Sequence, residues 1–153
     1  MKLNKIIQIV VLFIFVLSSC KEKIKEEKKE RRTKQNIETV QSNPLKESIA
    51  RGRLVYNDFC IQCHMATGKG VANTFPPLAN SDYLKNKQEE SIHGIKYGQK
   101  GELIVNGKTY NGVMMPMGLE DDEVADVMNY INNSWGNNYG DLVTEKEVAE
   151  IQK

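Results

Sequence analysis

The feature that most constrains this chain is the run Cys60-Ile61-Gln62-Cys63-His64. It places two thiols three positions apart and an imidazole directly after the second, in a chain that has only three cysteines. A redox-active dithiol, a zinc site and a covalently attached porphyrin all use this chemistry. Three cysteines are too few for a fold that is held together by disulfides.

The residues before the motif argue against a redox-active dithiol, because a thioredoxin-like Cys-x-x-Cys follows a strand in a βαβ unit. Residues 47–59 instead have helical periodicity, and we expect one side of this helix to be apolar. That side would carry Ile49, Leu54, Val55 and Phe59. A zinc site needs four ligands, and the spacing of the one remaining histidine, His93, is not typical of zinc families.

Covalent haem attachment explains the spacing mechanically. Two thiols three positions apart reach the two vinyl groups of one porphyrin, and the histidine that follows lies under the ring and coordinates the iron. We therefore predict one covalently bound haem c, attached through Cys60 and Cys63, with His64 as an axial ligand of the haem iron.

The iron needs a second axial ligand, and the sequence offers methionine or histidine. Met114, Met115 and Met117 lie beside a proline, in what we expect to be a loop before a helix. A single methionine is usually a core residue, but three within four positions favour a ligand loop. His93 is the competing candidate, and we expect it instead at the surface or as a hydrogen-bond donor near the site.

Two further elements are predicted around the methionine run. The Asn106-Gly107 pair between residues 103–105 and 108–110 favours a β-hairpin with a two-residue type I′ turn. Residues 120–123 are all acidic, which favours the first turn of a helix. The apolar face of this closing helix would carry Val124, Val127, Met128 and Ile131.

Residues 49–135 resemble a class I c-type cytochrome: a helix ending in Cys-x-x-Cys-His, a long central loop, a methionine loop and a closing helix. Residues 75–82 (FPPLANSD), 110–114 (YNGVM) and 133–137 (NSWGN) further resemble cytochrome c domains associated with copper nitrite reductases and related respiratory enzymes. The resemblance implies a small all-α fold, with helices packed around one covalently bound haem and a minor β-hairpin.

The resemblance also implies roles for individual residues. It points to Met114 as the axial ligand, since Met114 follows Asn-Gly-Val as in those relatives. Met115 stands where the relatives hold a proline and itself precedes a proline, so it remains an alternate ligand. Pro76 resembles the proline whose carbonyl accepts the other N–H of the axial histidine. The closing helix would cross the first helix near Gly52, with Tyr130 as its aromatic partner.

Residues 1–19 are predicted to be a lipoprotein signal peptide. A basic start precedes an apolar run at 6–17 that is too short to cross a hydrocarbon core of about 30 Å. Leu17-Ser18-Ser19-Cys20 resembles the bacterial lipobox, which implies that Cys20 is lipidated and becomes the mature N-terminus. Its acyl chains would anchor the protein to a membrane.

Charge separates the remaining segments. Residues 20–44 would comprise the lipidated cysteine and a charged, flexible tether, because positions 21–32 read KEKIKEEKKERR and hold too little apolar surface to fold. The region 45–153 holds 11 Lys/Arg and 15 Asp/Glu, a net charge of −4, although the whole chain carries +1. We predict a cytochrome c domain at 45–138 and a C-terminal tail at 139–153, and no nucleic-acid partner.

An iron with both axial positions filled by side chains favours one-electron transfer over catalysis, so we do not expect an enzyme. We expect a carrier in the cell envelope that faces the periplasm and exchanges electrons with redox proteins, for which the resemblance suggests a nitrite reductase or a terminal oxidase. Lys21 after Cys20 favours the outer membrane. The alternatives are an electron-accepting domain or subunit of a respiratory reductase or haem enzyme, and a haem redox sensor.

Overall fold

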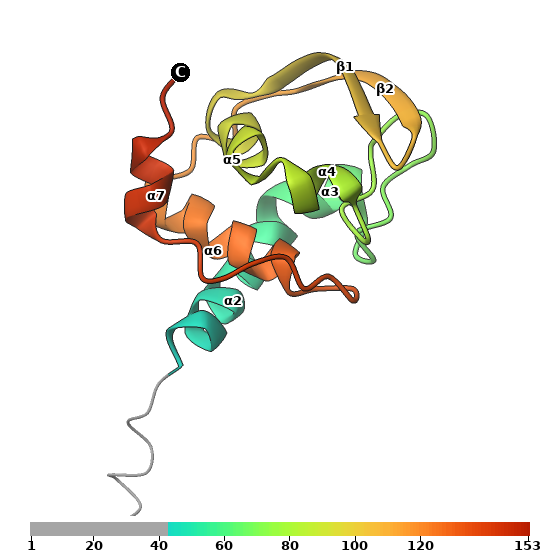
Figure 1. Cartoon of the computed structure of the whole chain (residues 1–153). Coiled ribbons are helices and arrows are strands. Elements are labelled where there is room, and N and C mark those ends of the chain that lie inside the picture. The colour runs from blue at the N-terminus through green and yellow to red at the C-terminus, as the bar shows by residue number, and fades with distance from the viewer. Residues whose placement is uncertain (1–42) are drawn as a thin grey trace, which may run out of the picture. The chain divides into compact units, whose positions relative to one another are not determined.

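The computed structural model describes residues 43–153, so the predicted signal peptide, Cys20 and most of the tether lie outside the described residues. Residues 43–153 pack as one unit (Figure 1). Its elements are α2 (Pro44–Val55), the π-helical turn η1 (Tyr56–Cys60), α3 (Ile61–His64), α4 (Asp82–Asn86), α5 (Gln88–Tyr97), β1 (Gln99–Val105), β2 (Lys108–Met114), α6 (Asp121–Asn132) and α7 (Glu145–Glu150). None of the helices within this range has the length and apolar character needed to cross a bilayer.

Helix α2 crosses α6 at close range. The buried residues of α2 and η1 are spaced four apart: Ser48, Gly52, Tyr56 and Cys60. At Gly52 the backbone of Asp126 leaves no room for a Cβ atom, and the ring centroids of Tyr56 and Tyr130 lie 5.3 Å apart. The crossing near Gly52 with Tyr130 as aromatic partner is therefore confirmed.

The predicted apolar side of this first helix is wrong at Leu54 and Phe59, although Val55 packs against the core. Leu54 is 60% exposed and Phe59 is 46% exposed, whereas the small residues Ser48 and Gly52 face α6. The physical reason is that two helix backbones in close contact need small residues between them, so the buried side is not the most apolar one. The helix also changes to a π-helical turn at Tyr56, which shifts the later residues around the axis.

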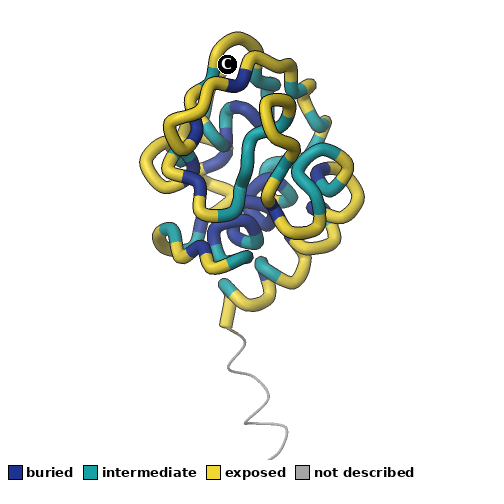
Figure 2. Tube along the Cα trace, turned by 90° about the vertical axis from the view of Figure 1, so that its right-hand side faces the viewer, coloured by how far each residue is buried: buried dark blue, intermediate teal, exposed yellow. Residues whose placement is uncertain are grey.

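The closing helix α6 has the predicted apolar face. Val124, Val127 and Met128 are fully buried, and Ile131 is 3% exposed. Figure 2 shows the buried residues gathered in the interior, with exposed residues along the outer turns. Residues 139–153 join the same core, since Val143 is 2% exposed and Val148 is fully buried against it.

The predicted hairpin is confirmed and is longer than expected. Strands β1 and β2 pair antiparallel from Val105↔Lys108 to Gln99↔Met114. Asn106 and Gly107 have φ values of 50° and 71°, as a type I′ turn requires. Met114 is the last residue of β2 and does not lie in a loop, which corrects that prediction. The all-α class with a minor hairpin is confirmed.

Candidate functional site

Two adjoining cavities lie between the motif at residues 60–64 and the hairpin. The inner cavity has a volume of about 90 Å³ and reaches the core residues Met128 and Ile131. The outer cavity has a volume of about 310 Å³ and reaches the exposed residues Val113 and Met115. The residues that line both are His64, Pro76, Gln99, Leu103 and Met114.

The two thiols of the motif reach different parts of this space. Cys60 ends η1 and lines the inner cavity, while Cys63 lies in α3 and lines the outer one. Neither forms a disulfide. Burial, with a smaller contribution from Cys63, raises the pKa of Cys60 to about 11, so this thiol is protonated at neutral pH. Both sulfurs are therefore available for bonds to a single group in this space.

His64 is held by one backbone carbonyl. Its Nδ1 lies 3.0 Å from the oxygen of Pro76, as the resemblance implied. Because a carbonyl only accepts, Nδ1 carries the proton and donates, which leaves the lone pair of Nε2 free. Burial lowers the pKa of His64, and the hydrogen bond to Pro76 opposes this shift only in part. A neutral imidazole with a free Nε2 is the form that binds metals.

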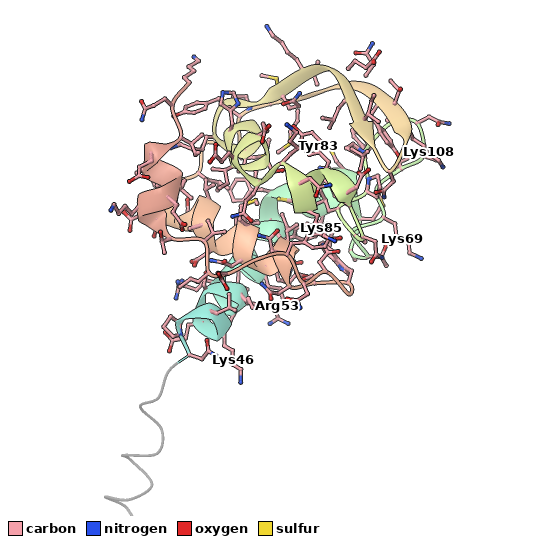
Figure 3. The ribbon with its side chains drawn as sticks, viewed as in Figure 1. Lys46, Arg53, Lys69, Tyr83, Lys85 and Lys108 are labelled. Atoms are coloured by element: carbon pink, nitrogen blue, oxygen red, sulfur yellow. The ribbon has the colours of Figure 1, made fainter. Side chains whose placement is uncertain are left out.

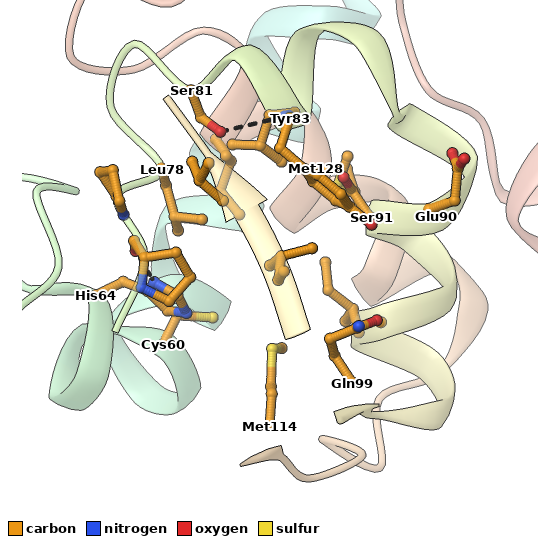
Figure 4. A pocket seen from close by; sticks show the side chains of 18 residues that line it. Cys60, His64, Leu78, Ser81, Tyr83, Glu90, Ser91, Gln99, Met114 and Met128 are labelled. Carbon is orange, nitrogen blue, oxygen red and sulfur yellow. Dashed lines mark hydrogen bonds between the residues drawn. The ribbon is translucent and has the colours of Figure 1, made fainter. Parts of the chain in front are cut away.

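Of the three methionines in the run, Met114 is the one that lines both cavities. Figure 4 shows its sulfur pointing into the inner cavity, with Cys60 and His64 on another wall of the same space. Met115 is 65% exposed and lines the outer cavity, and Met117 is half-buried there. His93 lines a third groove, which Met114 and Met115 also line, and packs its ring 5.1 Å from that of Tyr97.

The two alternative interpretations of the motif find no support in residues 43–153. Helical residues precede Cys60, where a thioredoxin-like dithiol would have a strand. Within this described part, no three histidine, cysteine or acidic side chains gather in a way that could hold a metal ion. A zinc site at the motif would lack its ligands.

Sequence reasoning missed that the hairpin itself forms a wall of the site. Leu103 lines both cavities, Val105 lines the inner one and Tyr110 the outer one. Ile104, which points the other way, is 58% exposed. The sequence signal that could have shown this is the alternation of side chains along residues 103–105. Because successive side chains of a strand face opposite sides, Leu103 and Val105 face the cavities and Ile104 faces away from them.

Comparison with known proteins places this site in a family. Residues 49–135 match the family model described as Cytochrome c. Cytochrome c-552 of Thermus thermophilus is 38% identical over 92 residues, which are 57% of this chain and 70% of that protein. The cytochrome c subunit of the quinone alcohol dehydrogenase of Gluconobacter oxydans is 32% identical over 105 residues, 66% of this chain and 22% of the subunit. The FixP subunit of the cbb3-type cytochrome c oxidase of Azorhizobium caulinodans is 31% identical over 124 residues, 75% of this chain and 40% of the subunit.

The walls of the two cavities fit the group that this family carries, a covalently attached haem c. Cys60 and Cys63 are free thiols on the same short turn, and His64 has a free nitrogen beside them. The surrounding lining is largely apolar, as a porphyrin ring requires. The cofactor of this chain is therefore one covalent haem c, whose iron supplies reversible one-electron exchange when bound.

Proposed function

Because this chain belongs to the cytochrome c family, we propose that it is a membrane-anchored carrier of single electrons between respiratory redox proteins. In this proposal Cys60 and Cys63 attach the haem, and His64 and Met114 are the axial ligands of its iron. Family members are electron carriers, although the dehydrogenase and oxidase relatives are subunits of enzyme complexes.

One observation carries the proposal: a neutral imidazole and a thioether sulfur line the same apolar cavity. Two side-chain ligands leave the iron no open position for a substrate, so electron exchange is favoured over catalysis. A thioether ligand also favours the reduced iron and raises the reduction potential relative to two histidines. Met114 meets this need better than Met115, whose side chain is 65% exposed.

The exposed residues at the outer cavity form a surface on which a redox partner could dock and exchange electrons. Val113 is 69% exposed and Met115 is 65% exposed at its lining, so a partner can make apolar contacts there. Lys69 on the central loop and Lys108 on the hairpin lie on the hairpin side of the molecule, whereas Lys46 and Arg53 lie on α2 (Figure 3). Relatives named as oxidase and dehydrogenase subunits support enzymes of these classes as partners. The proposal of a nitrite reductase as partner rests only on the resemblance of residues 75–82, 110–114 and 133–137 to cytochrome c domains associated with these enzymes.

The membrane anchor and the location rest on the sequence of residues 1–20. The lipobox resemblance supports lipidation of Cys20, and the export that it implies supports a periplasm-facing position, with Lys21 favouring the outer membrane. A tethered carrier has a high effective concentration beside membrane-bound partners. The test is the substitution Cys20→Ser, followed by membrane fractionation and mass spectrometry of the N-terminus. Release of the haem protein from the membrane is expected, and continued retention would contradict the anchor.

Optical spectra of the haem-loaded protein test the ligand assignment, with Met114→Ala and its matched control Met115→Ala. A methionine-sulfur charge-transfer band should disappear in Met114→Ala and persist in Met115→Ala. The reverse result would make Met115 the ligand. Carbon monoxide should not bind to the reduced, unchanged protein. If carbon monoxide binds readily and the band is missing, the iron is open, and a haem enzyme or a redox sensor replaces the carrier.

A further inference from the structure

Lys96, in the last turn of α5, is a partly buried lysine whose contacts join three segments. Its side chain is 11% exposed, and its Nζ lies 2.9 Å from Oδ1 of Asp121, the first residue of α6. The same Nζ donates to the carbonyl oxygens of Val148, at 2.7 Å, and Ile151, at 3.4 Å. An ammonium group has three N–H donors, so these three oxygens can occupy all of them.

The charge of Lys96 suits each of these partners. The hydrogen bond to Asp121 raises the pKa of Lys96, so the side chain stays cationic. Val148 lies in α7 and Ile151 is its C-cap, and a cation is favourable beside the carbonyls at the end of a helix. The neighbouring Tyr97 adds a second link, since its hydroxyl donates to the carbonyl of Ile151 at 3.0 Å.

The same end of α5 also holds the segment that carries the methionines. The carbonyl of Ile95 accepts from the backbone N–H of Met117 at 3.3 Å. A Cβ atom on Gly98 would lie 2.8 Å from the carbonyl oxygen of Met114 and 2.9 Å from Cδ of Pro116. Residues 95–98 therefore contact the methionine segment on one side and the C-terminal segment on the other.

The C-terminal segment is itself fixed to the core. The side chain of Asn129 donates to the carbonyl of Val143 and accepts from its N–H, both at 2.8 Å. Val148 is fully buried in the same cluster as Met128 and Ile131. The carbonyls of Val148 and Ile151 thus offer Lys96 acceptors whose position is set by the packing of α6.

We propose that Lys96 is a positioning residue, through which the C-terminal segment 143–151 holds the methionine segment 114–117 against the cavity and keeps Met114 on the iron. The inference rests on the proposed role of Met114 as axial ligand. Loss of the ammonium group removes the donor that joins Asp121 to the carbonyls of Val148 and Ile151, and leaves only the Tyr97 hydroxyl to link α5 to Ile151. The end of α5 then holds the methionine segment less firmly, and Met114 is displaced more easily.

Displacement of Met114 by added imidazole measures this directly in the oxidised, haem-loaded protein. Lys96→Met should raise the association constant for imidazole about tenfold, which corresponds to about 1.4 kcal/mol. Lys96→Arg keeps the charge and the donors and should restore the affinity of the unchanged protein. Lys100→Met, at an exposed lysine close by, is the matched control and should have no effect.

A purely structural role predicts a different result. If Lys96→Met lowers the unfolding temperature but leaves imidazole affinity unchanged, the proposal is overturned. Should this variant fail to fold, Tyr97→Phe removes only the second link to Ile151 and should raise the affinity about threefold, and no rise overturns the proposal. If Met114→Ala changes neither the affinity nor the charge-transfer band, the ligand assignment has failed instead.

Discussion

Gly52 of α2 lies directly against the backbone of Asp126 of α6, and no side-chain atom fits between them. The approach brings the carboxylate of Asp126 to polar groups of α2. It accepts from the hydroxyl of Ser48 at 2.6 Å and from Nη2 of Arg51 at 2.7 Å. The crossing that supports the Cys-x-x-Cys-His motif therefore depends on the absent side chain of Gly52 and on the buried carboxylate of Asp126.

Gly52→Ala should destabilise the protein by about 1–3 kcal/mol, because the added methyl group must push the two helix backbones apart. The better helix propensity of alanine offsets at most about 1 kcal/mol of this. Urea unfolding of the haem-loaded protein measures the change. Arg53→Ala, at the next, exposed residue of α2, should stay within about 0.5 kcal/mol of the unchanged protein. Equal stability of the two variants would contradict a close backbone contact at Gly52.

Gly70→Ala should raise the reduction potential. Gly70 has a φ of +61°, and a Cβ there would lie 2.6 Å from the carbonyl oxygen of Pro76. Displacing this oxygen weakens its hydrogen bond to Nδ1 of His64, which makes the imidazole a weaker donor and destabilises the oxidised iron. We expect a rise of roughly 30–60 mV, a three- to tenfold change in the one-electron equilibrium.

Potentiometric titration checks this, and Gly101→Ala is the control for backbone strain alone. Gly101 has a φ of +91°, but a Cβ atom added there would have nothing within 4 Å, so the potential of this variant should not change. A fall in the potential of Gly70→Ala, or an equal rise in both variants, would rule out an effect through Pro76.

Short sequence patterns were enough to predict the features that depend on neighbouring residues. The spacing of Cys60 and Cys63 and the Asn106-Gly107 turn each depend on a few adjacent residues, and the apolar face of α6 follows from its periodicity. The buried side of α2 was missed because small residues replace the apolar face wherever two backbones touch. The role of Lys96 was also beyond prediction, since its partners lie in segments far along the chain.

The C-terminal helix should respond to acid through Glu147. The backbone N–H and the hydroxyl of Thr144 donate to its carboxylate at 2.7 and 2.8 Å, and these bonds lower the pKa of Glu147. A lowered pKa in the folded state means that this stabilisation is complete above the unfolded pKa, near 4.5. It is lost as the pH falls below that value.

Amide hydrogen exchange in α7 measures the loss. Protection at Val148 should fall in the unchanged protein as the pH drops below 4.5, and Glu147→Gln, which cannot titrate, should show no such step. Thr144→Ala removes the capping hydroxyl and should cost about 1 kcal/mol at neutral pH, and less in acid, where protonated Glu147 no longer needs the hydroxyl as a donor. A step of the same size in Glu147→Gln would assign the pH dependence to another group.

Val113→Glu should slow electron exchange between two copies of the protein. Val113 is 69% exposed at the outer cavity, so two copies that exchange an electron through this face would bring two new carboxylates together. Like charges at such a contact cost several kcal/mol at low ionic strength, and we expect the self-exchange rate to fall at least about tenfold. Added salt should restore much of the rate, because exposed charges are screened. NMR line broadening in mixtures of the oxidised and reduced protein measures this rate.

The control is Ile104→Glu, which adds the same charge to the outward side of the hairpin. Ile104 is 58% exposed there, and this substitution should leave the self-exchange rate nearly unchanged. Equal slowing by both substitutions would place the exchange face elsewhere.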